Sequence, residues 1–120
     1  MLFRSYDSAE KMKKLIDKYF MQKDELKEKI RQLWVSQSYL SASFKKKYKI
    51  SPLKYLNLRR LQYAKKLLKD TELTVTDIAA SIGFESISAF CAFFKKSTGT
   101  SPGTFRSESA ADAERMHYSG

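Results

Sequence analysis

The chain has little of the residue types that build catalytic and metal sites. Its 120 residues include one cysteine, Cys91, and one histidine, His117. A lone cysteine can form no internal disulfide and no cysteine-based metal site, and it suits a reducing cytoplasm, where we expect the chain to act. Glycine-rich phosphate loops and catalytic motifs are missing as well. We therefore expect no enzyme activity, no metal and no cofactor.

Long apolar runs and β-type alternation are also missing from the sequence. No stretch approaches the ~18 apolar residues that a membrane-spanning helix needs, and residues 1–10 lack the apolar centre of a signal peptide. The apolar residues, which make up 42% of the chain, recur instead at the three- and four-residue spacing of amphipathic helices. The sequence therefore predicts an all-α protein with about seven helices and no membrane partner.

Small polar residues mark where the helices start. Ser51-Pro52 and Ser101-Pro102 each place a hydroxyl cap before a proline at the first helical position. The segment from Thr74 to Asp77 is similar to a capping box. Ser8 and Asp24 can cap the first two helices in the same way.

Positive charge is in excess and is unevenly placed along the chain. Lys and Arg number 23 against 13 Asp and Glu, which gives a formal net charge of +10. Residues 24–70 contain 13 of the cations and four acids, whereas residues 71–106 contain three of each. Such an excess favours a polyanionic partner, nucleic acid first and an anionic membrane surface second, although a basic protein of another kind stays open.

The second half of the sequence repeats the first. Phe44-Lys45-Lys46 returns as Phe94-Lys95-Lys96 and Ser51-Pro52 as Ser101-Pro102, both 50 residues later. Further upstream the offset is 49, which aligns Ile30 with Ala79 and Val35 with Phe84 and adds one residue to the second turn. Each copy reads as a short helix, a tight turn and a longer helix with a basic end, which is the pattern of a helix-turn-helix.

Two such copies joined by one helix suit duplex DNA. A linker of roughly 18 residues, at ~1.5 Å per residue, holds the second helices of the two copies about 27 Å apart or somewhat more. Because one turn of B-DNA is ~34 Å, one monomer can read two successive major grooves. We expect residues 1–50 to form an N-terminal helix and the first helix-turn-helix, 51–70 the linker helix, 71–106 the second helix-turn-helix, and 107–120 a C-terminal tail. A helical bundle with a duplicated hairpin is the alternative.

Residues 24–106 resemble the DNA-binding domain of the AraC/XylS family of transcription regulators. The motifs that carry the resemblance are VSQSYLS at 35–41, FKK at 44–46, SPLKY at 51–55, RLQYAKKLL at 60–68, DIAASIGF at 77–84, FCAFFKK at 90–96 and GTSPGTFR at 99–106. The resemblance implies seven helices and binding to double-stranded promoter DNA in a bacterial cytoplasm. It also implies activation of transcription, usually through contacts to RNA polymerase.

The resemblance further implies which side chains face the DNA. The base-facing positions are Ser38, Ser41, Ala42 and Lys45 in the first unit and Ile87, Ser88, Cys91 and Ala92 in the second. Phosphate contacts are expected from Lys46, Lys47, Lys49, Arg59, Arg60, Lys95 and Lys96, and Lys45 can serve there too. Family members often carry arginine at the positions of Ala42 and Ala92, so we expect weak direct readout of bases and an affinity that falls steeply with salt.

The first unit departs from the pattern of the second. Lys29 and Ile30 stand where the second copy has Ile78 and Ala79, so we expect altered packing in the first unit, with Trp34 filling the gap. In the second unit a set of aromatic residues at helical spacing is expected in the core: Phe84, Phe90, Phe93 and Phe94.

Two alternatives stay open at this level. The neutral second unit can serve as a protein-interaction module, or the chain can bind DNA with weak sequence specificity, with one unit that no longer reads it. The chain is a monomer if it is complete, and otherwise it is the DNA-binding end of a longer regulator.

Overall fold

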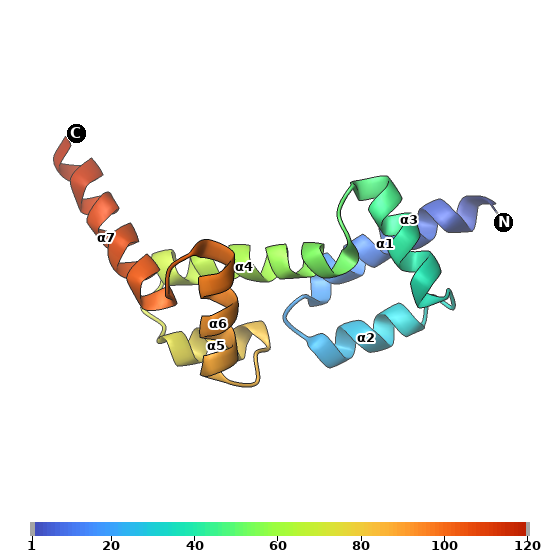
Figure 1. Ribbon diagram of the computed structural model, residues 1–120, viewed down its shortest axis with the longest axis horizontal. Helices are drawn as coiled ribbons and strands as arrows, with labels where there is room; N and C mark the ends of the chain where they lie inside the picture. The colour runs from blue at the N-terminus through green and yellow to red at the C-terminus, as the bar shows by residue number, and fades with distance from the viewer. Residues whose placement is uncertain (1, 120) are drawn as a thin grey trace. The chain divides into compact units, whose positions relative to one another are not determined.

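The computed structural model describes the backbone of residues 2–119 and the side chains of residues 8–113. These described residues form seven α-helices and no strand (Figure 1), which confirms the predicted fold class. The helices are α1 Leu2–Tyr19, α2 Lys23–Arg31, α3 Gln37–Tyr48, α4 Pro52–Asp70, α5 Val75–Ile82, α6 Ile87–Thr98 and α7 Pro102–Ser119. No single helix in this part of the chain is long and apolar enough to cross a membrane; α5 and α6 reach that apolarity only together, across an 87° bend.

The chain divides into two compact units, Met1–Arg60 and Leu61–Gly120, and the division falls inside α4. The linker helix expected over residues 51–70 is α4, whose first half belongs to the first unit and whose second half belongs to the second. The backbone over residues 107–119, which was expected as a tail, continues α7.

Side-chain caps begin most of the helices, as the sequence indicates. Ser51 Oγ accepts a hydrogen bond from Lys54 N at 3.2 Å, and Ser101 Oγ accepts one from Thr104 N at 3.1 Å. Thr74 Oγ1 accepts from the backbone N–H of Asp77 at 3.0 Å. Each of these bonds satisfies a donor that the first helical turn leaves without a partner, so the three predicted starts are confirmed.

The two caps predicted for the N-terminal helices are wrong. Ser8 is buried inside α1, which begins at Leu2, because the residues before Ser8 continue the helix instead of stopping it. Asp24 lies in the first turn of α2, whose N-cap position is Gln22 and has no side-chain cap bond. A carboxylate in the first turn still interacts favourably with the positive end of the helix dipole.

Aromatic and aliphatic side chains from three helices form the core of the second unit. Ala64 and Leu68 of α4 pack against Ile78, Ala79 and Ile82 of α5, together with Phe90 and Phe94 of α6. Phe84 and Phe93 pack against this cluster, which confirms the predicted aromatic core. The small side chain of Ala79 lets α5 lie directly against α6.

The core of the first unit lies between α1 and its two neighbours. Met12, Ile16 and Phe20 of α1 are buried, as are Leu40 and Phe44 of α3. α1 packs on both α2 and α3. On α2, Ile30 is only half-buried, whereas Ala79 at the corresponding position of the second unit is 2% exposed. Because the side chain of Ile30 is larger than that of Ala79, α2 and α3 pack differently from α5 and α6.

Trp34 does not fill the gap in the first unit, so that prediction is wrong. Its side chain is 91% exposed, and its backbone is in the left-handed region with φ 58°. The corresponding position in the second unit is Gly83, with φ 93°. Trp34 N donates to Arg31 O at 3.2 Å and Gly83 N to Ala80 O at 3.1 Å, so the two turns start alike. Because the turn fixes this backbone conformation, the tryptophan side chain is directed into solvent.

Candidate nucleic-acid interface

The exposed face of α3 carries the four base-facing residues predicted for the first unit. Ser38, Ser41, Ala42 and Lys45 are all exposed. Their spacing of three and four residues places them on one side of the helix, and the opposite side is anchored by Leu40 and Phe44, which are 1% and 0% exposed. Ser36 caps this helix by accepting a hydrogen bond from Tyr39 N at 3.2 Å. The first turn of α3 is therefore held in place next to the predicted contact surface.

α6 presents the corresponding face in the second unit. Ile87, Ser88 and Ala92 are exposed, whereas Cys91 is half-buried. The side chains that face the core are Phe90 and Phe94, which are both fully buried. Three of the four predicted residues are thus exposed on the free unit, and Cys91 is partly covered.

The chemistry of these eight positions is mostly short and uncharged. The hydroxyls of Ser38, Ser41 and Ser88 can donate and accept hydrogen bonds, directly or through water. The methyl groups of Ala42 and Ala92 can contact thymine methyl groups. Lys45 supplies the one charge among the eight, and its ammonium can donate to guanine O6 or N7. Arginine, whose planar guanidinium fixes a bidentate contact to guanine, is not among them.

Four of the seven predicted phosphate contacts are exposed at the basic ends of the two helices. They are Lys46 and Lys49 at the end of α3, and Lys95 and Lys96 at the end of α6. Lys49 is the C-cap of α3 in the left-handed conformation, with φ 65°. Cations at a helix C-terminus compensate the helix dipole, and here they can also meet phosphate oxygens.

The other three predicted phosphate contacts form interactions inside the first unit. Lys47 Nζ lies 2.7 Å from Glu10 Oε1, and this contact lowers the pKa of Glu10 below its ordinary value. Arg59 Nε lies 3.1 Å from Asp17 Oδ1. Arg60 Nε donates to the Phe20 carbonyl oxygen at 3.1 Å, and burial lowers the pKa of Arg60. These side chains hold α1 against α3 and α4.

Asp17 is the centre of this set of contacts. Besides Arg59, it accepts a hydrogen bond from Tyr55 Oη and pairs with Lys13 Nζ at 3.3 Å. The guanidinium of Arg59 also lies 5.0 Å from the centre of the Phe20 ring. Since the ion pair and the cation–π contact both engage Arg59, its role in the free chain is to join α1 to α4.

The excess of positive charge is confined to one of the two units. Residues 1–60 contain 16 Lys and Arg against six Asp and Glu, and residues 61–120 contain seven of each. Electrostatic attraction to a polyanion therefore comes from the first unit. In the second unit the exposed pair Lys95 and Lys96 is a local concentration of charge on a neutral background.

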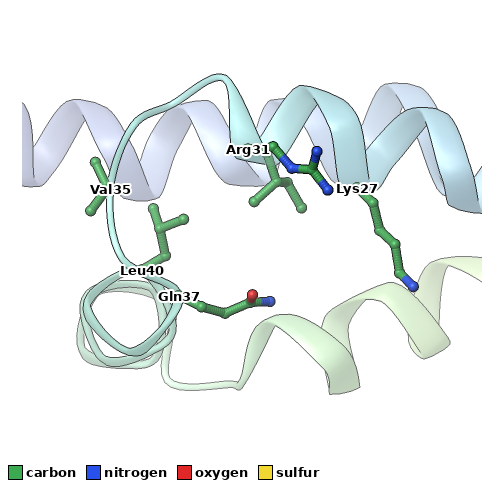
Figure 2. A pocket seen from close by; sticks show the side chains of 6 residues that line it. Lys27, Arg31, Val35, Gln37 and Leu40 are labelled. Atoms are coloured by element: carbon green, nitrogen blue, oxygen red, sulfur yellow. The ribbon is translucent and has the colours of Figure 1, made fainter.

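A hollow of about 300 Å³ lies between α2 and α3 of the first unit (Figure 2). It is lined by Lys27, Ile30, Arg31, Val35, Gln37 and Leu40. Sequence reasoning did not single out Lys27 and Arg31, although their i, i+4 spacing on a helix places two cations on one face. The signal for the hollow in the sequence was Ile30, at the position that corresponds to Ala79 of the second unit, since a larger residue keeps α2 and α3 apart.

Metal ligands do not cluster in the part of the chain that the structure describes. No group of three or more His, Cys, Asp or Glu side chains among these residues could hold a metal ion. His117, the single histidine, lies outside the residues whose side chains are described.

Comparison with known proteins places this arrangement in a family. A family model described as "Helix-turn-helix domain" matches residues 30–108. An uncharacterised helix-turn-helix transcriptional regulator of Escherichia coli, YijO, is 41% identical over 73 residues, which is 61% of this chain and 26% of that protein. The C-terminal domain of AraT, a response regulator from Geobacillus stearothermophilus, is 33% identical with a TM-score of 0.78, covering 84% of each chain.

A third similar structure is the DNA-binding domain of AdpA, a global transcriptional factor that was solved in complex with a target DNA. It has a TM-score of 0.70 and covers 85% of this chain and 95% of its own, and at 20% identity it shows the fold alone. The chain therefore belongs to the helix-turn-helix family, and its two repeated units make it a domain of the AraC/XylS type. This membership supports the expectation that it is not an enzyme. The chain spans between 11% and 35% of the length of curated relatives that it matches, and about a quarter of YijO.

Proposed function

We propose that the chain binds double-stranded DNA and regulates transcription from the sites that it occupies. The observation that carries this proposal is the shared geometry of α3 and α6. In each unit a turn with one residue in the left-handed conformation leads into a helix that is anchored by two buried side chains. This helix exposes one face and has lysines in its last turn. A helix presented in this way fits the major groove of B-DNA.

The proposal extends to two successive major grooves, one for each unit. Its support is the length of α4, whose 19 residues span about 28 Å at 1.5 Å per residue. This is somewhat less than the ~34 Å turn of B-DNA, and contacts by the helices on either side extend the reach. A domain of similar fold, that of AdpA, was solved on its target DNA.

Affinity in this proposal comes mainly from phosphates. Lys45, Lys46, Lys49, Lys95 and Lys96 are exposed and can release counterions from the duplex, whereas the base-facing side chains are short. Sequence preference then depends on thymine methyl groups, water and the deformability of A·T-rich DNA. Binding should accordingly weaken steeply as salt is raised.

We propose further that the chain acts as an activator in a bacterial cytoplasm, through a contact to RNA polymerase. The support is the AraC/XylS type of the domain and the +10 charge of a chain with a single cysteine. As a covalently joined pair of units, the domain can read DNA as a monomer. Adding the chain to a cell-free transcription reaction on a promoter that it binds tests whether it activates or represses. More transcript is expected, and less transcript would assign a repressor.

Footprinting on genomic DNA tests the proposal most directly. The expected result is two protected patches about one helical turn apart on one face of the duplex, as two adjacent major grooves require. A single protected patch would contradict the two-groove proposal, and uniform weak protection at every sequence would contradict sequence-dependent binding.

The second candidate function is a protein-interaction role for the second unit. The observation that favours it is the charge balance of residues 61–120, together with an exposed Ile87 on the recognition helix. In that case α3 alone reads DNA and α6 contacts another protein. Charge reversal in each unit separately distinguishes the two functions, because only a unit that contacts DNA loses affinity for it.

A further inference from the structure

The hollow between α2 and α3 has a two-part chemistry that its position in a helix-turn-helix does not require. Its apolar side is formed by Ile30, Val35 and Leu40. Its polar side has Lys27 and Arg31 from α2 and the amide of Gln37 from α3, and Figure 2 shows these side chains around one space. At about 300 Å³ the hollow reaches the lower end of the volume range typical of small-molecule sites.

The cations of this hollow are available to a ligand. Lys27 and Arg31 are exposed and lie on one face of α2. Arg31 Nη1 is 3.5 Å from Glu28 Oε2, and the side chains of this pair are 80% and 56% exposed. A solvent-exposed ion pair of this kind contributes little, so a ligand anion can replace Glu28 without a large cost.

We propose that the hollow binds a small carboxylic acid with an apolar body. Its carboxylate pairs with Lys27 and Arg31 and accepts a hydrogen bond from the Gln37 amide, since an arginine guanidinium matches carboxylate oxygens in geometry. Its apolar body packs on Ile30 and Val35, which are both partly exposed. A phosphate of the DNA backbone could use the cations, but it would leave this apolar surface uncovered, and so the observations favour the amphipathic acid.

Binding at this position acts on the recognition helix from its inner side. Leu40 is 1% exposed, belongs to α3 and is followed directly by Ser41 of the predicted contact face. A bound acid also neutralises charge in the only unit with an excess of cations. The acid therefore weakens DNA binding, and by linkage DNA weakens binding of the acid by the same factor. This second step rests on the proposed function, whereas binding of the acid does not.

The probe is 4-phenylbutanoate, titrated into the intact chain by isothermal calorimetry. The expected result is one molecule per chain with a Kd of about 1 mM or lower, as is reasonable for a ligand of this size. Acetate, which has the charge without the body, and 4-phenylbutanamide, which has the body without the charge, should each bind at least tenfold more weakly. The fluorescence of Trp34, the only tryptophan and the neighbour of Val35, provides an independent signal.

Two sets of variants locate the site. Lys27→Gln with Arg31→Gln should raise the Kd of 4-phenylbutanoate at least tenfold and leave that of the amide unchanged. The matched control, Lys11→Gln with Lys14→Gln, removes the same charge from exposed positions of α1 and should leave both unchanged. Equal effects of the two double variants would overturn the proposal, as would acetate binding as tightly as 4-phenylbutanoate.

Val35→Phe tests the apolar side of the hollow. Phe84 stands at the corresponding position of the second unit, where its ring centre lies 5.5 Å from that of Phe90 and contributes to a closed core. Phenylalanine at 35 should fill the hollow and abolish binding while circular dichroism shows an unchanged helix content. Binding that persists in this folded variant would place the acid elsewhere and overturn the site.

DNA binding is then measured with and without 4-phenylbutanoate. A several-fold weaker DNA affinity that disappears in Lys27→Gln with Arg31→Gln supports the coupling, and an unchanged affinity overturns it. If the chain binds the acid but no DNA at any salt concentration, the proposed function fails while the acid site stands.

Discussion

Arg106 Nε donates a hydrogen bond to the carbonyl oxygen of Leu68 at 3.0 Å, and Arg106 Nη2 donates to Thr71 O at 3.2 Å. Leu68 lies in the last turn of α4, where carbonyl groups have no partner within the helix. The first unit contains the same relationship, because Arg60 Nε donates to Phe20 O directly after α1. In both units an arginine from the helix that follows the recognition helix donates to a carbonyl group at the C-terminal end of the helix that precedes the helix-turn-helix.

Replacing Arg106 with methionine keeps most of the apolar stem and removes these bonds. We expect the free energy of unfolding to fall by about 2 kcal/mol, because charged hydrogen bonds are lost and carbonyl groups remain without partners. Urea denaturation followed by circular dichroism measures the change. Arg31→Met, at a side chain that is 80% exposed, is the control and should change stability little. Equal losses in the two variants would contradict the capping role of Arg106.

Trp34 is in a backbone conformation that costs free energy for a residue with a side chain. At φ 58° the side chain is 91% exposed and gains little from packing. Trp34→Gly should therefore raise the free energy of unfolding by about 1 kcal/mol, since glycine adopts this conformation without the steric penalty. The converse change, Gly83→Ala, should lower it by a similar amount. A loss of stability in Trp34→Gly would show that the tryptophan makes contacts that offset the strain.

The sequence predicted those parts of the fold that depend on neighbouring residues. Caps at Ser51, Thr74 and Ser101 are formed with residues three positions away, so they can be read from short motifs. Ser8 and Asp24 failed because a cap residue marks a start only if the chain before it stops being helical. The exposure of Trp34 depended on the backbone conformation of the turn, which the size of the side chain does not reveal.

The candidate site likewise has a part that the sequence predicts and a part that it does not. Exposure of Ser41, Ala42 and Ala92 followed from helical spacing against the buried side of the same helix. The internal roles of Lys47 and Arg59 did not, since their partners Glu10 and Asp17 lie 37 and 42 residues earlier in the sequence. Contacts over such separations are set by packing of the unit, and composition shows only that these residues are cations.

Tyr55 makes the stability of the first unit depend on pH in the alkaline range. Burial, and then the hydrogen bond to Asp17, raise the pKa of Tyr55 above its ordinary value of 10.0. A raised pKa in the folded state stabilises the fold below pH 10, and this contribution is lost as the pH rises through the folded pKa. The pKa of Lys13 is raised by its bond to Asp17 and acts in the same direction.

Tyr55→Phe should therefore lower stability at pH 7 by about 1 kcal/mol and reduce the further loss between pH 9 and 11. Thermal unfolding at a series of pH values measures both effects. Tyr39→Phe, at an exposed position of α3, controls for the general effect of removing a tyrosine hydroxyl. An unchanged alkaline loss in Tyr55→Phe would contradict the role assigned to this tyrosine.

Charge reversal tests whether both units contact DNA. Lys46 and Lys96 occupy corresponding exposed positions at the ends of α3 and α6. If both contact phosphates, Lys46→Glu and Lys96→Glu each weaken binding several-fold and reduce the slope of log affinity against log salt by about one. Fluorescence anisotropy at several salt concentrations measures the affinity and the slope. An effect of Lys46→Glu alone would favour the protein-interaction role of the second unit.

The two alanines on the recognition helices allow a gain-of-function test. Ala42 and Ala92 are exposed, and their sequence neighbours carry no guanidinium or amide group. Arginine at either position can bond to O6 and N7 of guanine, which contributes about 1–3 kcal/mol of discrimination per contact. Ala42→Arg and Ala92→Arg should each shift the preferred site toward a guanine in its own half, as selection from a random DNA library measures. Lysine at the same positions adds the charge without the bidentate geometry, so it should raise affinity without this preference. If arginine and lysine behave alike, the helix faces contact only the backbone, and specificity in this chain comes from the shape of the DNA.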